Sequence, residues 1–197
     1  LILAFAVAVM VIAGLAFAGY EYGVPYVQYE LAKKEYEAGA YEQAAQQFAA
    51  LGDYKDADVM VRQCQVNQAQ QLVGAATEEE VLQARALYAG LNDAQNVAHC
   101  DWLRAEIMFS EGRYDEAEPL YLSLGNQYES PARLTEIAYI RACDLFDDAK
   151  WEAAREAFTA LGDYKDCADR YLDTWYTPAV SAMKDDDPET ALTLFAQ

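Results

Sequence analysis

The stretch GAYEQAAQQFAALGDYKDA, residues 39–57, decides the fold, because AKWEAAREAFTALGDYKDC repeats its pattern at residues 149–167. The segment GDYKD occurs twice, at residues 52–56 and 162–166. We call the difference in residue number between the two copies, from 52 to 162, the GDYKD offset. The pair Ala44 and Phe48 returns with the same offset, as Ala154 and Phe158. The GDYKD offset is too long for one repeat unit and fits three units. The sequence therefore predicts an internal repeat.

Weaker copies of the pattern fill the intervening sequence. Each copy has a small residue followed four positions later by an aromatic one, and the small residues follow one another in steps of 40, 33, 37 and 37 along the chain. Five units at this period indicate a stacked α-solenoid, in which each unit buries its apolar face only against its neighbours. The five small residues, named here the alanine ruler, are Ala44, Ala84, Ala117, Ala154 and Ala191.

The spacing within a unit is helical. Residues at i, i+3, i+4 and i+7 share one face of a helix, so Tyr41, Ala44, Phe48 and Leu51 form a single stripe. Strand signals are nearly absent. We therefore predict an all-α chain of about five helical hairpins over residues 21–197.

Polar residues at the predicted helix starts support this interpretation. Gly52 is expected to end a helix, and Asp53 to accept hydrogen bonds from the next one, with Asp56 adding negative charge to its first turn. The other predicted starts are the capping box of Thr77 with Glu80, Ser130 before Pro131, and Asp187 before Pro188.

The N-terminal residues form a separate segment. Leu1 to Ala18 is an uncharged apolar run, and about 20 helical residues cross a bilayer core of roughly 30 Å. Tyr20, Tyr22 and Tyr26 follow it, where aromatic rings favour the headgroup layer. Residues 1–20 are therefore predicted to be a transmembrane helix. A cleaved signal peptide is the alternative, because Ala16-Phe17-Ala18 is a small-x-small triplet that would leave Gly19 as the first residue.

The charge balance argues against a nucleic-acid partner. The chain has 14 Lys and Arg against 33 Asp and Glu, a net charge of −19, which would repel a phosphate backbone. An enzyme is not expected either. His99 is the only histidine, and its surroundings match no catalytic triad or zinc-protease motif. We predict no cofactor and no metal site.

Two further groups of residues receive structural interpretations. The four cysteines, Cys64, Cys100, Cys143 and Cys167, form no C-x-x-C pair and fall in predicted first helices of repeats, where buried free thiols are expected. The acidic runs Glu78–Glu80 and Asp185–Asp187 lie at predicted helix N-termini, where carboxylates complement the helix dipole.

The repeated pattern resembles a known family. Gly-x-Tyr-x-x-Ala-x-x-x-Phe, in Gly39–Phe48 and in the similar Gly112–Tyr121, resembles the second half of a tetratricopeptide repeat. The LGDYKDA form is similar to repeats of bacterial single-pass membrane proteins, and the resemblance covers roughly residues 25–197. It implies a protein-interaction scaffold without assigned activity in the bacterial cell membrane, with its repeats outside the cytoplasm. Lys33 and Lys34, close to the membrane, would favour the opposite orientation.

The resemblance also implies candidate binding residues. When the repeats are aligned on the alanine ruler, four aromatic residues and Ala69 take the same position in the first of the two helices of each repeat. In tetratricopeptide-like superhelices, side chains at that position face the concave groove. Aromatic rings there would form a ladder that holds a peptide or an extended chain. The competing interpretation is that these rings pack between helices. The groove candidates are Tyr29, Trp102, Tyr139 and Tyr176, with Arg104, Arg141 and Lys184 as polar supplements.

Two functions follow from these observations. The first is a membrane-anchored, non-catalytic scaffold that binds a protein or peptide partner. The alternative is a surface-displayed binder of cell-wall glycan or extended peptide through the aromatic ladder. The sequence stops at Gln197 inside a predicted helix, without a polar capping helix, so we also expect self-association through the last repeat.

Overall fold

The computed structural model describes residues 19, 23–75 and 77–196. The predicted transmembrane segment, residues 1–20, and the predicted cleavage site at Ala18-Gly19 lie outside these residues except for Gly19. None of the helices formed by the described residues has the length and the apolar character needed to span a bilayer.

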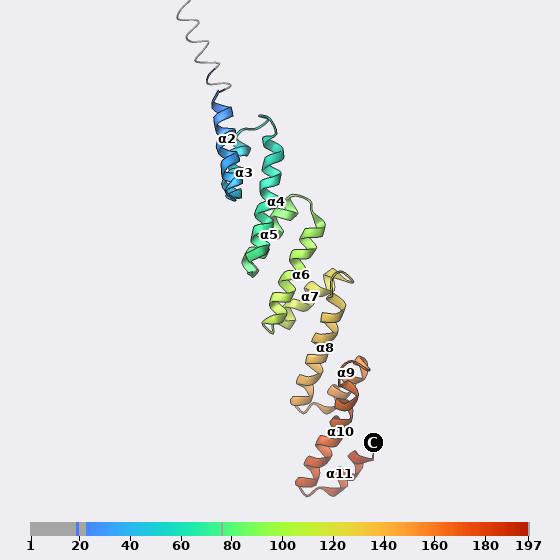
Figure 1. Cartoon of the computed structure of the whole chain (residues 1–197). Coiled ribbons are helices and arrows are strands. Elements are labelled where there is room, and N and C mark those ends of the chain that lie inside the picture. Colours follow the sequence, from blue (N-terminus) through green and yellow to red (C-terminus); the bar gives the residue numbers. More distant parts are fainter. Residues whose placement is uncertain (1–18, 20–22, 76, 197) are drawn as a thin grey trace, which may run out of the picture. The chain divides into compact units, whose positions relative to one another are not determined.

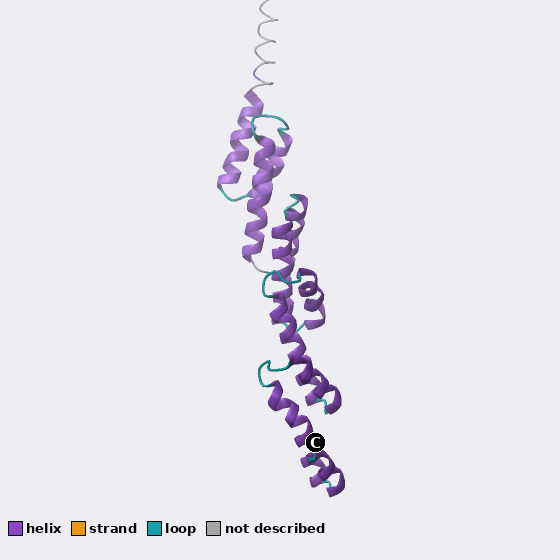
Figure 2. Ribbon diagram, turned by 90° about the vertical axis from the view of Figure 1, so that its right-hand side faces the viewer, coloured by secondary structure: helices purple, strands orange, loops and turns teal. Residues whose placement is uncertain are grey.

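The described residues form helices and no strands, as Figures 1 and 2 show. The predicted all-α class is therefore confirmed for this part of the chain. The helices are α2 (Val24–Glu37), α3 (Tyr41–Ala50), α4 (Ala57–Ala75), α5 (Glu78–Gly90), α6 (Ala94–Ser110), α7 (Tyr114–Leu124), α8 (Ser130–Asp147), α9 (Trp151–Leu161), α10 (Cys167–Lys184) and α11 (Pro188–Phe195).

Helices that follow one another in the chain pack together. Contacts divide the chain into two units, one reaching to Arg104 and the other starting at Ala105, so that the boundary falls within α6. In the first unit α3 packs between α2 and α4, and α5 packs on α4. In the second unit α7, α8, α9, α10 and α11 pack in sequence order. Such nearest-neighbour packing is what stacked helical hairpins require.

The alanine ruler marks the core. All five alanines are buried, which lets the partner helix approach closely at each of them. The aromatic residue four positions later is buried in the first four copies, namely Phe48, Tyr88, Tyr121 and Phe158. The fifth, Phe195, is 46% exposed.

The GDYKD offset relates two copies of the same core. In the first unit Phe48 is buried with Ala32, Ala44 and Ala57. In the second unit the residues at the GDYKD offset from these four, Ala142, Ala154, Phe158 and Cys167, form the equivalent cluster. Three consecutive helices of the same unit, α2–α4 or α8–α10, therefore build one core around a single fully buried aromatic residue.

The predicted helix ends are mostly confirmed. Gly52 and Gly162 follow α3 and α9 with φ of +57° and +59°, a conformation that suits glycine. The Thr77 and Asp187 side chains accept from the N–H groups of Glu80 and Thr190, 3.3 and 3.1 Å away.

Two predicted caps are wrong. α8 begins at Ser130 itself, whose buried hydroxyl has no hydrogen-bond partner and so does not cap the helix. Asp53 lies in the turn after Gly52, well before α4 begins at Ala57, so Asp56 occupies the position before the helix.

Candidate interaction surfaces

The GDYKD segment of the first unit holds a tyrosine from α2. The Tyr29 hydroxyl donates to Oδ1 of Asp56 over 2.6 Å. The Lys55 Nζ lies 4.2 Å from the centroid of the Tyr29 ring, and the Tyr54 ring meets Tyr29 edge-on at 6.1 Å. We call Tyr29, Tyr54, Lys55 and Asp56 the tyrosine clamp. Within the first unit, the clamp ties α2 to the segment that leads into α4.

The second unit contains the same clamp at the GDYKD offset. Tyr139 donates to Oδ1 of Asp166 over 2.5 Å, and the Lys165 Nζ lies 4.6 Å from the Tyr139 ring centroid. Glu136 adds a carboxylate that accepts from Lys165 and from the Tyr164 hydroxyl, 2.5 and 2.6 Å away. The repeated GDYKD segment thus has a structural role.

Hydrogen bonding in the clamp changes the acidity of its members. The bond to Asp56, followed by burial, raises the pKa of Tyr29 to about 12, and the same bond lowers the pKa of Asp56. The corresponding bond to Asp166 raises the pKa of Tyr139 and lowers that of Asp166. Each clamp therefore pairs a neutral tyrosine with an ionised carboxylate at neutral pH.

Tyr29 and Tyr139, two of the predicted ladder residues, thus have their hydroxyls and rings engaged within the chain. Sequence reasoning placed them in a ligand groove and did not find the clamp. The signal was present, because the separation in sequence between Tyr29 and Asp56 is the same as that between Tyr139 and Asp166. The ligand-facing role of the ladder stays a prediction.

The candidates Trp102 and Arg104 lie on α6 in the first unit. The Trp102 ring stacks on His99, with centroids 5.8 Å apart. The Arg104 guanidinium is mostly buried and forms an ion pair with Glu78 of α5 at 3.5 Å. Arg104 therefore joins two helices of the first unit.

The remaining candidates lie in the second unit and differ in surroundings. Arg141 of α8 reaches two carboxylates of α7, with 2.7 Å to Asp115 and 2.7 Å to Glu118. Lys184 is exposed in the last turn of α10. Tyr176 is 60% exposed, and its ring meets Phe195 edge-on at 5.9 Å.

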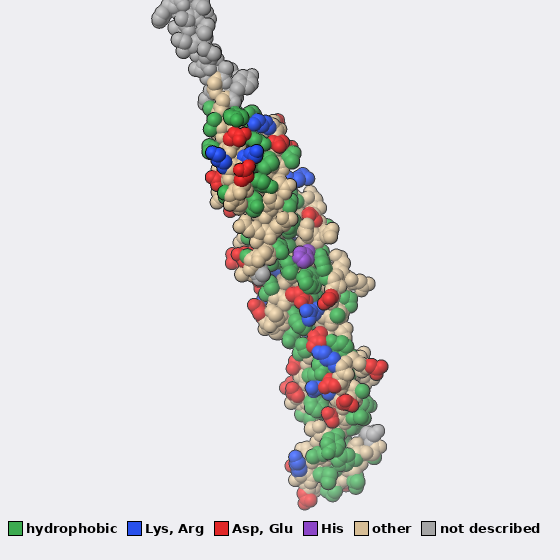
Figure 3. Space-filling model, viewed as in Figure 1, with side chains coloured by type: hydrophobic (Ala, Val, Ile, Leu, Met, Phe, Trp, Pro, Cys, Tyr) green, Lys and Arg blue, Asp and Glu red, His purple; other side chains and the backbone are tan. Residues whose placement is uncertain are grey.

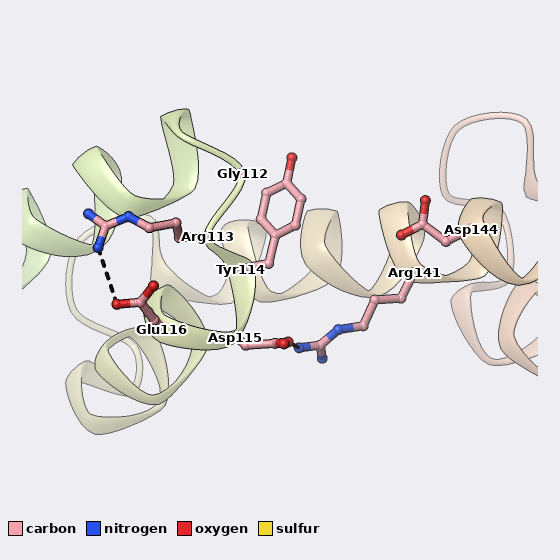
Figure 4. Close-up of a pocket in the computed structure, with 7 residues that line it drawn as sticks. All are labelled: Gly112, Arg113, Tyr114, Asp115, Glu116, Arg141 and Asp144. Atoms are coloured by element: carbon pink, nitrogen blue, oxygen red, sulfur yellow. Dashed lines mark hydrogen bonds and ion pairs between the residues drawn. The ribbon is translucent and has the colours of Figure 1, made fainter.

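A pocket of about 300 Å³ lies where α7 begins beside α8 (Figure 4). Its lining is Gly112, Arg113, Tyr114, Asp115, Glu116, Arg141 and Asp144. Both arginines are already engaged by carboxylates, Arg113 with Glu116 at 3.1 Å and Arg141 with Asp115. The positive charges of the pocket are thus paired within the chain, and Asp144 adds a further carboxylate to its lining.

Apolar side chains are exposed on two surfaces. On α2 they are Val24, Val27 and Leu31, which lie on one side of the helix, together with Tyr26; we call this the α2 face. Figure 3 shows hydrophobic side chains gathered over α10 and α11 in the second unit. The exposed residues there, named the α10–α11 face, are Leu172, Tyr176, Met183, Leu192 and Phe195.

Comparisons with known proteins found no relative. No protein-family model matches the chain. No curated protein and no solved structure is significantly similar to it. The tetratricopeptide-like resemblance therefore remains a prediction.

The thiols are placed largely as predicted. Cys64, Cys100 and Cys167 are buried in the first helices α4, α6 and α10, and burial raises the pKa of each of these thiols. Cys143 in α8 is only half-buried. Within the described part of the chain, no three His, Cys, Asp or Glu residues are grouped so as to hold a metal ion.

Proposed function

We propose that the chain is a membrane-anchored, non-catalytic scaffold whose helical repeats bind a protein partner. The observation that carries this proposal is the pair of exposed apolar surfaces, the α2 face and the α10–α11 face, on helices held by repeated cores. Contiguous exposed apolar side chains mark interaction sites more often than isolated ones do. Helices fixed by packing present such side chains with little loss of entropy on binding.

The anchor is part of the same proposal. An uncharged run from Leu1 to Ala18 is long enough to cross a bilayer, and tyrosines follow it. The repeats are proposed to lie outside the cytoplasm, as the resemblance implies. Protease treatment of whole cells that carry a tag after residue 197 tests this orientation. Digestion of the tag supports it, and protection until lysis contradicts it.

Photo-crosslinking in cells tests partner binding. A photoreactive phenylalanine analogue replaces Tyr176 in the full chain, and in a matched control it replaces Ser181, an exposed residue on a different side of α10. We expect a discrete adduct of higher mass at Tyr176 and none at Ser181. A second variant carries the analogue at Leu31, on the α2 face. If neither the Tyr176 variant nor the Leu31 variant gives an adduct, the two apolar surfaces are not binding sites and the scaffold function fails.

A glycan-binding function is a second candidate, supported by the exposed ring of Tyr176. Sugar rings stack on open aromatic faces, and Tyr176 is 60% exposed. Substitution of Tyr176 or Trp102 with Ala should then reduce retention of the full chain on purified cell-wall material. Unchanged retention of both variants rules this candidate out.

A further inference from the structure

The α2 face and the α10–α11 face correspond to the two sides of a junction that is closed within the second unit. α2 is equivalent to α8, because the GDYKD offset relates the two helices. α10 and α11 are equivalent to α6 and α7, because Ala117 and Ala191 are two equal steps apart on the alanine ruler. The junction of α8 with α6 and α7 is therefore a template for a contact between α2 and α10–α11.

In the closed junction an apolar centre is bordered by two arginines of α8. At the centre Ile137 of α8 is 1% exposed and Tyr121 of α7 is 0% exposed. Arg133 bonds Glu106 at 2.6 Å and lies 4.8 Å from the Phe109 ring centroid. The second arginine, Arg141, bonds Asp115 and Glu118 of α7.

The equivalent central residues are exposed on the two open faces. Val27 takes the place of Ile137 and is 55% exposed, and Phe195 takes the place of Tyr121 and is 46% exposed. Both positions carry large apolar side chains that the repeat packing buries elsewhere. Among the described residues, no helix covers Val27 or Phe195 as neighbouring helices cover Ile137 and Tyr121.

The bordering ion pairs change on both sides together. Leu31, 51% exposed, stands where α8 has Arg141, and Leu192, 70% exposed, stands where α7 has Glu118. Gly23 likewise replaces Arg133, and Val180 replaces Glu106. The arginine and its partner carboxylate are therefore lost together at two places, Leu31 with Leu192 and Gly23 with Val180, whereas Glu189 keeps the negative charge of Asp115. Leu31 and Leu192 are two exposed apolar side chains that match each other where the template has an ion pair.

We propose that the α10–α11 face of one copy of this chain docks on the α2 face of a second copy, head to tail. The inference rests on the proposed scaffold function and names its partner at these two faces. Leu31 also lines a groove of about 300 Å³ between α2 and α3, beside Gln28 and Gln47, which can receive a side chain such as Leu192. A second copy carries both matching halves, and a head-to-tail contact of this kind is heterologous and open-ended.

Sedimentation velocity of the full chain, residues 1–197, in a mild nonionic detergent tests the proposal. Between about 1 and 100 μM, the wild-type chain should form species that grow with concentration. Leu31→Arg and Leu192→Glu should each weaken association at least about tenfold, because each puts an unpaired charge against an apolar surface. Mixing the two variants should restore association, because the unchanged α10–α11 face of Leu31→Arg can dock on the unchanged α2 face of Leu192→Glu. Arg at 31 and Glu at 192 can also form the pair that Arg141 and Glu118 form in the template.

Leu82→Arg and Leu122→Glu are the controls, because these leucines are also exposed but lie outside both faces. They should associate as the wild type does, and circular dichroism should show unchanged helix content in all four variants. A monomeric wild type overturns the proposal. So does a mixture that fails to reassociate, or a loss caused by Leu192→Glu alone, which indicates a symmetric contact.

The same data separate this inference from the scaffold function. An adduct of twice the chain mass from photo-crosslinking at Tyr176 supports docking of a second copy. An adduct of another mass, together with a monomeric wild type, leaves the scaffold function standing and removes the head-to-tail contact.

Discussion

Phe158 and Phe195 occupy the same position of the repeat and differ in their surroundings. Phe158 lies in a core that α8, α9 and α10 build together, whereas Phe195 meets the ring of Tyr176 at an exposed surface. The same residue type at equivalent positions therefore gives a matched comparison of burial.

Phe158→Ala should lower the free energy of unfolding by about 3–5 kcal/mol, because it removes a buried ring and leaves a cavity. Phe195→Ala should cost less than about 1 kcal/mol, since its ring is nearly half exposed. Urea unfolding followed by circular dichroism measures both. Equal losses would mean that Phe195 is buried in solution.

The tyrosine clamp predicts a response to alkaline pH. The folded-state pKa of Tyr29 is about 12, above its ordinary value of 10.0. A raised folded pKa means that the bond to Asp56 contributes its full stability below pH 10 and loses it as the pH rises towards 12. Absorbance at about 295 nm, where tyrosinate absorbs, should therefore show Tyr29 ionising late.

Two variants identify that titration. Tyr29→Phe should remove one tyrosine from the late part of the curve, and Asp56→Asn should move one tyrosine to lower pH because the carboxylate acceptor is gone. If neither variant changes the high-pH part of the titration curve, the assignment of that part to Tyr29 is wrong.

At the scale of single elements, the helix ends depend on backbone conformation. Gly162 ends α9 with φ of +59°, whereas Gly74 lies within α4 without a positive φ. The two positions have open space where a Cβ would stand, so side-chain crowding does not separate them.

Alanine substitutions at these glycines should have opposite signs. Gly162→Ala should destabilise the fold by about 1 kcal/mol, because an L-residue is strained at positive φ. Gly74→Ala should stabilise it by about 0.5 kcal/mol, because alanine loses less backbone entropy than glycine on taking up a helical conformation. Thermal unfolding of the two variants and the wild type measures the difference. A stabilising Gly162→Ala would mean that the turn after α9 has another conformation in solution.

The sequence predicted the elements better than their contacts. Helical periodicity and the alanine ruler located the hairpins, because burial of one face at helical spacing leaves a local signature. The Asp56 contact was missed, because its partner Tyr29 lies on another helix and the motif alone suggested that Asp56 adds negative charge to the first turn of the next helix. The exposure of Phe195 also depends on which helix covers it, and no local pattern records that.

At the scale of the whole molecule, each unit has a core of its own. Phe48 centres the cluster of the first unit and Phe158 that of the second. In repeat proteins, stability is approximately a sum of units and nearest-neighbour terms, so local damage is expected to stay local.

Hydrogen exchange followed by mass spectrometry tests this locality. Phe48→Ala should speed exchange in α2, α3 and α4, which build the damaged core, far more than in α8, α9 and α10. Phe158→Ala is the reciprocal control and should reverse the pattern. Equal acceleration in both sets of helices for either variant would show that the chain opens as one cooperative body.

The duplicated clamp also bears on how the chain refolds. Tyr29 and Tyr139 each donate to an aspartate within an identical GDYKD segment, so this hydrogen bond alone does not distinguish the correct partner from its copy in the other unit. Misassembly and exchange of identical elements between chains are characteristic failures of repeat proteins. At high protein concentration, refolding should therefore yield kinetically trapped, domain-swapped species, which dilution before refolding suppresses.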